Sequence, residues 1–254
     1  SQKINEKIQK AKGLIASSNE IVDKIEKFND LINIEKTDIT GDFTFDNKNL
    51  YVASNRGRDK IAIFEFDLIK SKEGRLIFEH DEVDVSNLLF SRKRKVLTGV
   101  SYTVAKNEMI FFDKWREEIQ QQLEKKFPGY EVVITSFSKD EAEAVVVTYS
   151  DKSRGTYYHY EVNKNKLTEL GKVSPWLNEK NMSEMKPINY RSRDGLTING
   201  YLTLPKGTNG KNLPVVVNPH GGPWARDNWG YKSEIQFLAN RGFAVFQMNF
   251  RGST

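Results

Sequence analysis

The sequence predicts β-propeller-type antiparallel blades, incomplete in number, followed by the start of a parallel α/β domain. Three observations indicate this order. From about residue 40, short runs of β-branched and aromatic residues alternate with turn residues. The same succession of runs and turns recurs roughly 95 residues later, which is about two periods of a propeller blade. After residue 195 the pattern becomes strand, loop, helix and strand, the order of a βαβ unit.

The predicted blades consist of short strands joined by polar turns. In the first copy, strands are expected at residues 50–53, 61–66 and 76–78, with turns at 54–57 and around 72–74. In the second copy, strands are expected at 145–149, 157–162 and 167–170, with turns at 153–155 and 163–165. Between the copies, strands at 96–102 and 109–112 and a helix at 115–127, ended by Pro128-Gly129, fit an intervening blade.

The number of blades leaves two architectures open. At most about three blades fit before residue 180, whereas a closed propeller needs at least four. We therefore expect residues 37–184 to form either an arc of a propeller or a different β-sheet domain. Residues 1–36 carry apolar side chains at helical spacing and are expected to form a helical N-terminal segment.

Residues 185–254 are expected to form the third part of the chain. Asp194-Gly195 predicts a hairpin-like turn before an alternating strand at 196–204. Residues 215–217 are continuously apolar, as a buried parallel strand should be. A second buried strand is expected at 243–248. The helix between these strands, at 233–240, should end at Arg241-Gly242 and bury Ile235, Phe237, Leu238 and Ala239.

The composition favours a globular protein over a membrane protein. The 254 residues include 39 basic and 34 acidic side chains, and the net charge of +5 is spread along the chain. The densest basic cluster, Arg92-Lys93-Arg94-Lys95, is expected to be a solvated hairpin turn and not a nucleic-acid patch. No apolar run approaches the ~20 residues of a spanning helix. Neither nucleic acid nor a membrane is therefore an expected partner.

Cysteine and histidine usage limits the possible chemistry. The absence of cysteine excludes disulfides, thiolate metal sites and thiolate nucleophiles. The three histidines, His80, His159 and His220, lie far apart without carboxylates at ligand spacing, so neither a metal nor a cofactor is expected. No secretory signal opens the chain, which slightly favours a cytoplasmic location.

The most informative motif is His220-Gly221-Gly222-Pro223, which follows the apolar strand at 215–217 almost directly. An α/β-hydrolase builds half of its oxyanion hole in this way, because a glycine-rich loop after a buried strand can turn backbone N–H groups toward a developing negative charge. Glycines suit such a loop because they lack Cβ and permit close approach. A plain Gly-Gly turn after a strand is common, and it is the simpler interpretation of the tetrapeptide alone.

The residues around this motif add a family resemblance. They are Met185, Pro187, Tyr190, Arg193-Asp194-Gly195-Leu196, Ile198, Gly200-Tyr201-Leu202, Leu213-Pro214, Trp224, Arg226-Asp227, Gln236-Phe237-Leu238-Ala239, Arg241-Gly242-Phe243-Ala244-Val245 and Asn249-Phe250-Arg251-Gly252-Ser253-Thr254. Through them the segment 185–254 resembles the prolyl oligopeptidase family of serine peptidases, in its acylaminoacyl-peptidase-like and dipeptidyl-peptidase-like bacterial branch. Weaker matches at 51–59, 100–102, 112–113 and 155–158 fall where that family has a β-propeller.

The resemblance implies an α/β-hydrolase domain capped by a propeller, with a Ser-Asp-His triad that hydrolyses peptide bonds of short peptides. It implies that the Gly222 N–H is an oxyanion donor and that Gly221, His220 and Pro223 shape its loop. Trp224, together with Pro223, would line the substrate cleft. On the same basis Arg226, Asp227 and Arg251 are expected to be structural.

None of the residues 1–254 fits the role of nucleophile. No Gly-x-Ser-x-Gly turn occurs, and Ser253 stands in a Gly-Ser-Thr turn. His220 is not the expected triad base, because that histidine follows the nucleophile in the chain. We expect the triad to lie beyond Thr254 and these residues alone to be inactive. Two alternatives remain, an esterase-like or lipase-like α/β-hydrolase and a non-catalytic propeller interaction module.

Overall fold

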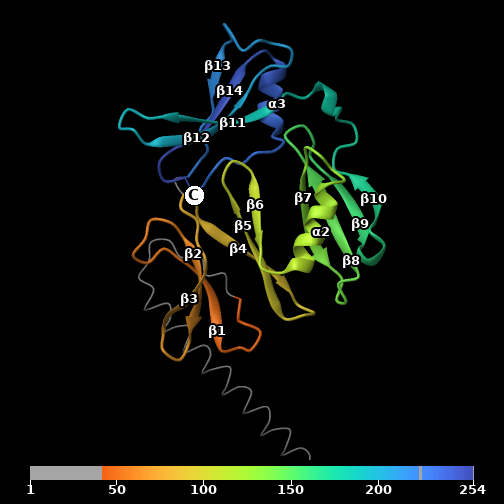
Figure 1. The fold of residues 1–254 in the computed structure, drawn as a ribbon. Helices are drawn as coiled ribbons and strands as arrows, with labels where there is room; N and C mark the ends of the chain where they lie inside the picture. Colours follow the sequence, from red (N-terminus) through yellow and green to blue (C-terminus); the bar gives the residue numbers. More distant parts are fainter. Residues whose placement is uncertain (1–41, 223–224, 254) are drawn as a thin grey trace, which may run out of the picture. The chain divides into compact units, whose positions relative to one another are not determined.

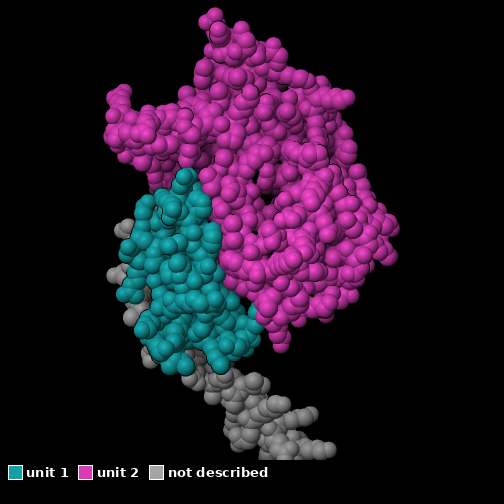
Figure 2. Space-filling view, in the orientation of Figure 1, with its two compact units in different colours: residues 1–87 teal, residues 88–254 magenta. Residues whose placement is uncertain are grey.

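The computed structural model describes residues 42–222 and 225–253. The expected helical segment at 1–36 and the predicted site residues Pro223 and Trp224 lie outside these ranges. The chain divides into two compact units, Ser1–Asn87 and Leu88–Thr254 (Figure 2). Its elements are mostly antiparallel β-strands that pair in short sheets (Figure 1).

In the first unit, three strands pair in chain order. They are β1 (Asn49–Ser54), β2 (Ala62–Asp67) and β3 (Lys72–Phe78), and both pairs are antiparallel. The three strands expected from the sequence are confirmed. Their core is formed by the buried side chains of Leu50, Val52, Ala62, Phe64 and Phe66.

The predicted turn around residues 72–74 is wrong, because these residues belong to β3. The chain turns earlier, where the Asp67 carboxylate accepts hydrogen bonds from the N–H groups of Ile69 (3.0 Å) and Lys70 (2.9 Å). An aspartate whose side chain accepts hydrogen bonds from backbone N–H groups two and three residues later favours a turn. Here this signal decides the position of the turn, and the charged residues next to Gly74 do not. Gly74 instead meets a close backbone neighbour, since a Cβ there would lie 3.0 Å from the Glu65 carbonyl oxygen.

The second sheet follows in the chain and has the order β4-β5-β6. Its strands are β4 (Val85–Ser91), β5 (Val96–Thr103) and β6 (Asn107–Phe111). Residues 92–95 form the turn between β4 and β5, as the basic cluster predicts. Strand β4 was not predicted from the sequence. Its apolar residues follow a long acidic and polar stretch.

The third sheet has four strands in chain order. They are β7 (Glu131–Phe137), β8 (Glu143–Tyr149), β9 (Thr156–Glu161) and β10 (Lys166–Lys172), all antiparallel to their neighbours. The last three strands were expected, whereas β7 was not. A short 3₁₀ turn, η1 (Val162–Lys164), joins β9 to β10, and a second, η2 (Glu179–Asn181), follows β10.

Helix α2 (Lys114–Glu124) precedes β7 and packs on the third sheet (Figure 1). It begins at Asp113, whose carboxylate accepts a hydrogen bond from the Arg116 N–H at 2.8 Å, a standard N-cap. Its apolar face contributes Ile119 and Leu123 to a core shared with the buried residues of the sheet, Val132, Ala144, Val146 and Tyr160. The predicted helix is confirmed, although it ends three residues earlier than expected.

The last sheet is mixed and has the strand order β11-β12-β14-β13. Its strands are β11 (Met185–Arg191), β12 (Thr197–Thr203), β13 (Val215–Val217) and β14 (Ala244–Asn249). Strands β13 and β14 are parallel, with helix α3 (Ser233–Asn240) between them in the chain. The predicted βαβ order and the turn at Asp194-Gly195 are confirmed; in that turn the Gly195 N–H donates to the Ser192 carbonyl at 2.9 Å.

Two predictions of burial in this region are wrong. Strand β13 is parallel as expected but not buried, since Val215 is 61% and Val217 52% exposed. Within the described residues β13 pairs with β14 alone, so one of its edges is uncovered. On α3, Phe237 is 56% exposed and lies under the Arg241 guanidinium at 4.2 Å, while Gln236 is buried in its place.

Gln236 connects helix α3 to the segments before β11. Its amide oxygen accepts a hydrogen bond from the Ser183 N–H at 2.8 Å, and its amide nitrogen donates to the carbonyls of Ser183 (2.8 Å) and Asp151 (3.0 Å). The Asp151 carboxylate in turn accepts from the Met185 N–H at 2.7 Å. These bonds satisfy buried backbone groups that no strand or helix pairs.

We predict that Gln236→Leu destabilises the protein by roughly 3 kcal/mol, because it leaves three buried backbone groups without partners. Glu234→Gln, on the exposed side of the same helix, should change stability by less than about 0.5 kcal/mol. Urea unfolding followed by tryptophan fluorescence measures both. Equal stability of the two variants would contradict the role given to Gln236.

Candidate functional site

The candidate site lies where two loops leave the same edge of the last sheet. Because β13 and β14 are parallel, residues 218–222 and 250–253 both follow the carboxyl ends of their strands. The Asn218 N–H still bonds the Phe246 carbonyl at 2.8 Å, so the first loop separates from the sheet only after that residue. Ligand sites of open parallel sheets typically form at this edge.

His220 joins the two loops. Its Nδ1 lies 2.7 Å from the Gly221 carbonyl oxygen, and its Nε2 lies 2.7 Å from the Ser253 hydroxyl. The ring also stacks on Phe250, with centroids 4.3 Å apart and planes 15° from parallel. Because a carbonyl oxygen only accepts, Nδ1 carries the proton; in the neutral ring Nε2 then accepts from the Ser253 hydroxyl.

The two glycines of the motif lie in the first loop, outside any strand, and both are exposed. Gly222 has φ of +153°, a conformation that side chains with a Cβ rarely adopt. Gly221 has no atom near the position of a Cβ. The backbone at these residues is therefore shaped by glycine and is open to an incoming group.

Beyond the undescribed residues 223–224, Arg226 holds the other end of the loop. Its guanidinium donates to the carbonyls of Thr103 (2.6 Å), the last residue of β5, and Val104 (2.7 Å), the first residue of the turn between β5 and β6. Tyr201, on β12, contacts the same turn, because its hydroxyl donates a hydrogen bond to the Ala105 carbonyl at 2.8 Å. Burial raises the pKa of Tyr201, which keeps this donor protonated.

Asp227 fixes the segment after Arg226 to strand β14. Its carboxylate is paired with Lys232 and accepts a hydrogen bond from the Gln247 amide at 2.8 Å. Its backbone N–H donates to the Asn249 side-chain oxygen at 2.8 Å, and its carbonyl accepts from the Asn249 amide at 3.1 Å. Residues on both sides of 223–224 are thus anchored to the same sheet.

The second loop has its own anchor in Arg251. This guanidinium forms an ion pair with Asp194 and reaches the Ser192 hydroxyl at 3.3 Å, both in the β11–β12 turn. The Ser192 hydroxyl and Arg251 hold the pKa of the Asp194 carboxyl well below its usual range. The carboxylate therefore stays ionised, and the contact persists, at any ordinary pH.

Of the predicted site residues, the structure brings His220, Gly221 and Gly222 together at the carboxyl edge. Arg226 and Arg251 are held in structural contacts. The sequence analysis did not identify Tyr201 and Gln247 as supports of the loop. A signal existed for Gln247, because a polar residue inside an otherwise apolar strand has to find a hydrogen-bond partner.

The described residues contain neither a candidate metal cluster nor a candidate membrane-spanning helix. No group of three or more histidine, cysteine, aspartate or glutamate side chains is arranged to hold a metal ion in residues 42–222 and 225–253. Over the same ranges, no helix has the length and apolar character that crossing a membrane requires.

Comparison with known proteins identifies the family. The chain is 34% identical over 237 residues to dipeptidyl aminopeptidase BIII of Pseudoxanthomonas mexicana, covering 90% of this chain and 34% of that protein. It is 28% identical over 242 residues to dipeptidyl peptidase family member 6 of Caenorhabditis elegans, covering 85% and 32%. A solved structure from a study of two prolyl endopeptidases has a TM-score of 0.58 at 19% identity, covering 81% and 30%. The chain belongs to the prolyl oligopeptidase family.

No family model matches this prolyl oligopeptidase family member. The chain spans about a third of the length of the curated relatives it matches. The likeness to the solved structure supports the fold, and both relatives are named as peptidases.

We predict that His220→Phe keeps the stack on Phe250 but loosens both loops, because it removes the hydrogen bonds to Gly221 and Ser253. The free energy of local opening at residues 250–253 should fall by about 1–2 kcal/mol. Hydrogen–deuterium exchange resolved by peptide measures this fall. His159→Phe, on β9, serves as control and should leave these residues unchanged; unchanged exchange in His220→Phe would refute the joining role.

Proposed function

We propose that this chain is part of a serine-type peptidase that removes short units from the N-terminus of small peptides, as a dipeptidyl, aminoacyl or acylaminoacyl peptidase. The observation that carries the proposal is the His220-Gly221-Gly222 loop at the carboxyl edge of a parallel strand pair, anchored on both sides. The printed names of the relatives, dipeptidyl aminopeptidase and dipeptidyl peptidase, support the same substrate class.

In the proposed reaction, a serine attacks the carbonyl of a peptide bond and the carbonyl oxygen becomes an anion. The N–H of Gly222 donates to this oxyanion, a contact worth several kcal/mol in enzymes from which one such donor was removed. His220 and Gly221 shape the loop and hold that N–H in place. Pro223 and Trp224, which the family resemblance predicts to line the substrate cleft, lie outside the described residues. No cofactor or metal enters this scheme.

The proposal places the Ser-Asp-His triad outside residues 1–254, because these residues contain no Gly-x-Ser-x-Gly turn. Ser253 donates to His220, yet the other ring nitrogen of His220 bonds a backbone carbonyl instead of the carboxylate that a triad requires. We therefore assign Ser253 to loop support and not to nucleophilic attack.

We further propose that the sheets β1–β3, β4–β6 and β7–β10 are blades of a β-propeller within residues 37–184. Residues 185–254 would be the first part of an α/β-hydrolase domain. The succession of antiparallel sheets in chain order and the likeness to the prolyl endopeptidase structure support this division.

A substitution at Gly222 tests the oxyanion assignment in the full-length protein. Gly222→Ala should lower kcat on a dipeptidyl p-nitroanilide by about 10²–10³-fold, because a Cβ at a positive φ displaces the N–H donor. Gly207→Ala introduces the same kind of strain in a remote loop and should retain normal kcat. Similar kcat values for the two variants would contradict the assignment.

Full-length protein that hydrolyses simple esters but no peptide would favour an esterase. Protein that hydrolyses neither would favour a non-catalytic module.

A second experiment tests the position of the nucleophile. Purified residues 1–254 should neither hydrolyse the p-nitroanilide nor react with a fluorophosphonate probe. In the full-length protein, Ser253→Ala should still react with the probe, while mass spectrometry should locate the label at a serine outside this segment. Labelling of Ser253 would overturn the proposed mechanism.

A further inference from the structure

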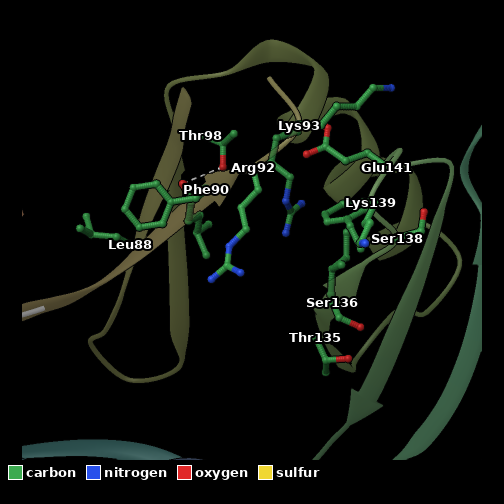
Figure 3. A pocket seen from close by; sticks show the side chains of 14 residues that line it. Leu88, Phe90, Arg92, Lys93, Thr98, Thr135, Ser136, Ser138, Lys139 and Glu141 are labelled. Atoms are coloured by element: carbon green, nitrogen blue, oxygen red, sulfur yellow. Dashed lines mark hydrogen bonds between the residues drawn. The ribbon is translucent and has the colours of Figure 1, made fainter. Parts of the chain in front are cut away.

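A cavity of about 690 Å³ lies in the second unit, away from the two loops of the candidate site. Its walls come from β4, β5 and the turn between them, from β7 and the turn after it, and from Arg116 of α2. Figure 3 shows the β4–β5 side chains facing those of β7 and its following turn. Strands β4 and β7 are each the first strand of their sheet in the chain. The volume falls in the range of small-molecule binding pockets.

The lining of this cavity is strongly basic. It includes four cationic side chains, Arg92, Lys93, Arg116 and Lys139, and a single carboxylate, Glu141. Glu141 is already engaged, since it accepts hydrogen bonds from the Ser91 hydroxyl at 2.5 Å and from Arg94 at 3.3 Å, and Arg94 does not line the cavity. The one acidic side chain therefore leaves most of the positive charge uncompensated.

Arg116 is the least expected of these cations, because it is only 5% exposed. Its guanidinium donates to the Gln120 side-chain oxygen at 3.1 Å and lies 5.2 Å from the ring of Phe111 and 5.8 Å from that of Phe137. Among the described residues, no carboxylate lies within ion-pair distance of it. Burial lowers the pKa of Arg116 to about 10, although the more distant carboxylates of Glu124 and Asp113 partly offset this effect.

Arg92 adds a second guanidinium without a carboxylate partner in the described part of the chain. Its exposed side chain extends into the space between β4 and β7 (Figure 3). Lys93 differs, because its ammonium bonds the Asp140 carbonyl at 2.7 Å. Apolar side chains complete the walls, namely those of Leu88, Leu89, Phe90, Ile134 and Phe137.

We propose that this cavity binds a small organic carboxylate, such as a short acidic peptide, through the guanidinium groups of Arg92 and Arg116. A planar guanidinium matches a carboxylate with two parallel hydrogen bonds, and the apolar walls favour an anion that carries a carbon framework over an inorganic one. The residues that line this cavity are not among those of the candidate active site, so anion binding here does not require the proposed peptidase activity.

Isothermal titration calorimetry at an ionic strength of about 20 mM tests this site. The probes are the peptide Gly-Asp-Asp, its C-terminal amide, the neutral peptide Gly-Asn-Asn amide, and inorganic phosphate. We expect the acidic peptide to bind and the neutral amide not to bind. Retained binding of Gly-Asp-Asp amide assigns the contact to side-chain carboxylates, and lost binding assigns it to the C-terminal carboxylate.

Matched variants separate binding from folding. Arg92→Gln and Arg116→Met should each weaken Gly-Asp-Asp binding by about tenfold or more, whereas Lys95→Gln removes a charge from the same turn outside the cavity and should change it less than about twofold. Arg116→Met should leave the melting temperature unchanged or raised, because it removes an uncompensated buried charge.

Three results would overturn the proposal. They are no binding of Gly-Asp-Asp, phosphate binding as tight as that of the peptide, and unchanged peptide affinity in either Arg92→Gln or Arg116→Met.

Discussion

The parallel pairing of β13 with β14 is the constraint on which the candidate site depends. Only a parallel pair sends both following loops to one edge of the sheet, where His220 can contact Ser253 at 2.7 Å. An antiparallel register would separate these residues by the length of a strand. The stack of His220 on Phe250 then limits how the ring can turn, so the loop geometry follows from strand direction and one aromatic contact.

Polar side chains connect the last sheet to the β5–β6 turn and to the segment before β11. Arg226 and Tyr201 hold three successive carbonyls at the β5–β6 turn, and Gln236 satisfies the backbone before β11. The Lys106 ammonium, from the same turn, lies 3.6 Å from the ring centre of Trp229. Directional bonds of this kind specify one arrangement of the sheets, because displacement would leave several carbonyls without donors.

Much of this organisation could be predicted from the sequence, and the exceptions have physical causes. Strands with β-branched runs, the helix capped by Asp113 and the βαβ order were all expected from local patterns. The exposure of Val215 was not, because the burial of a strand's side chains depends on what packs on the faces of its sheet and not on the residues of the strand alone. The hydrogen bond from Arg226 to the Thr103 carbonyl joins residues 123 positions apart in the chain, and no local sequence pattern predicts a contact over that separation. Arg116 was expected only as part of a helix, and its unpaired charge became apparent once its neighbours were known.

The central claim is that the loop after β13 presents the Gly222 N–H to a developing oxyanion. A crystal structure of the full-length protein with a dipeptide boronic acid bound to its nucleophile tests this most directly, since the boronate mimics the tetrahedral intermediate. The account predicts a boronate oxygen about 2.7–3.1 Å from the Gly222 nitrogen, with His220 still bonded to Ser253. A boronate oxygen held by other donors, with the Gly222 N–H turned away, would contradict it.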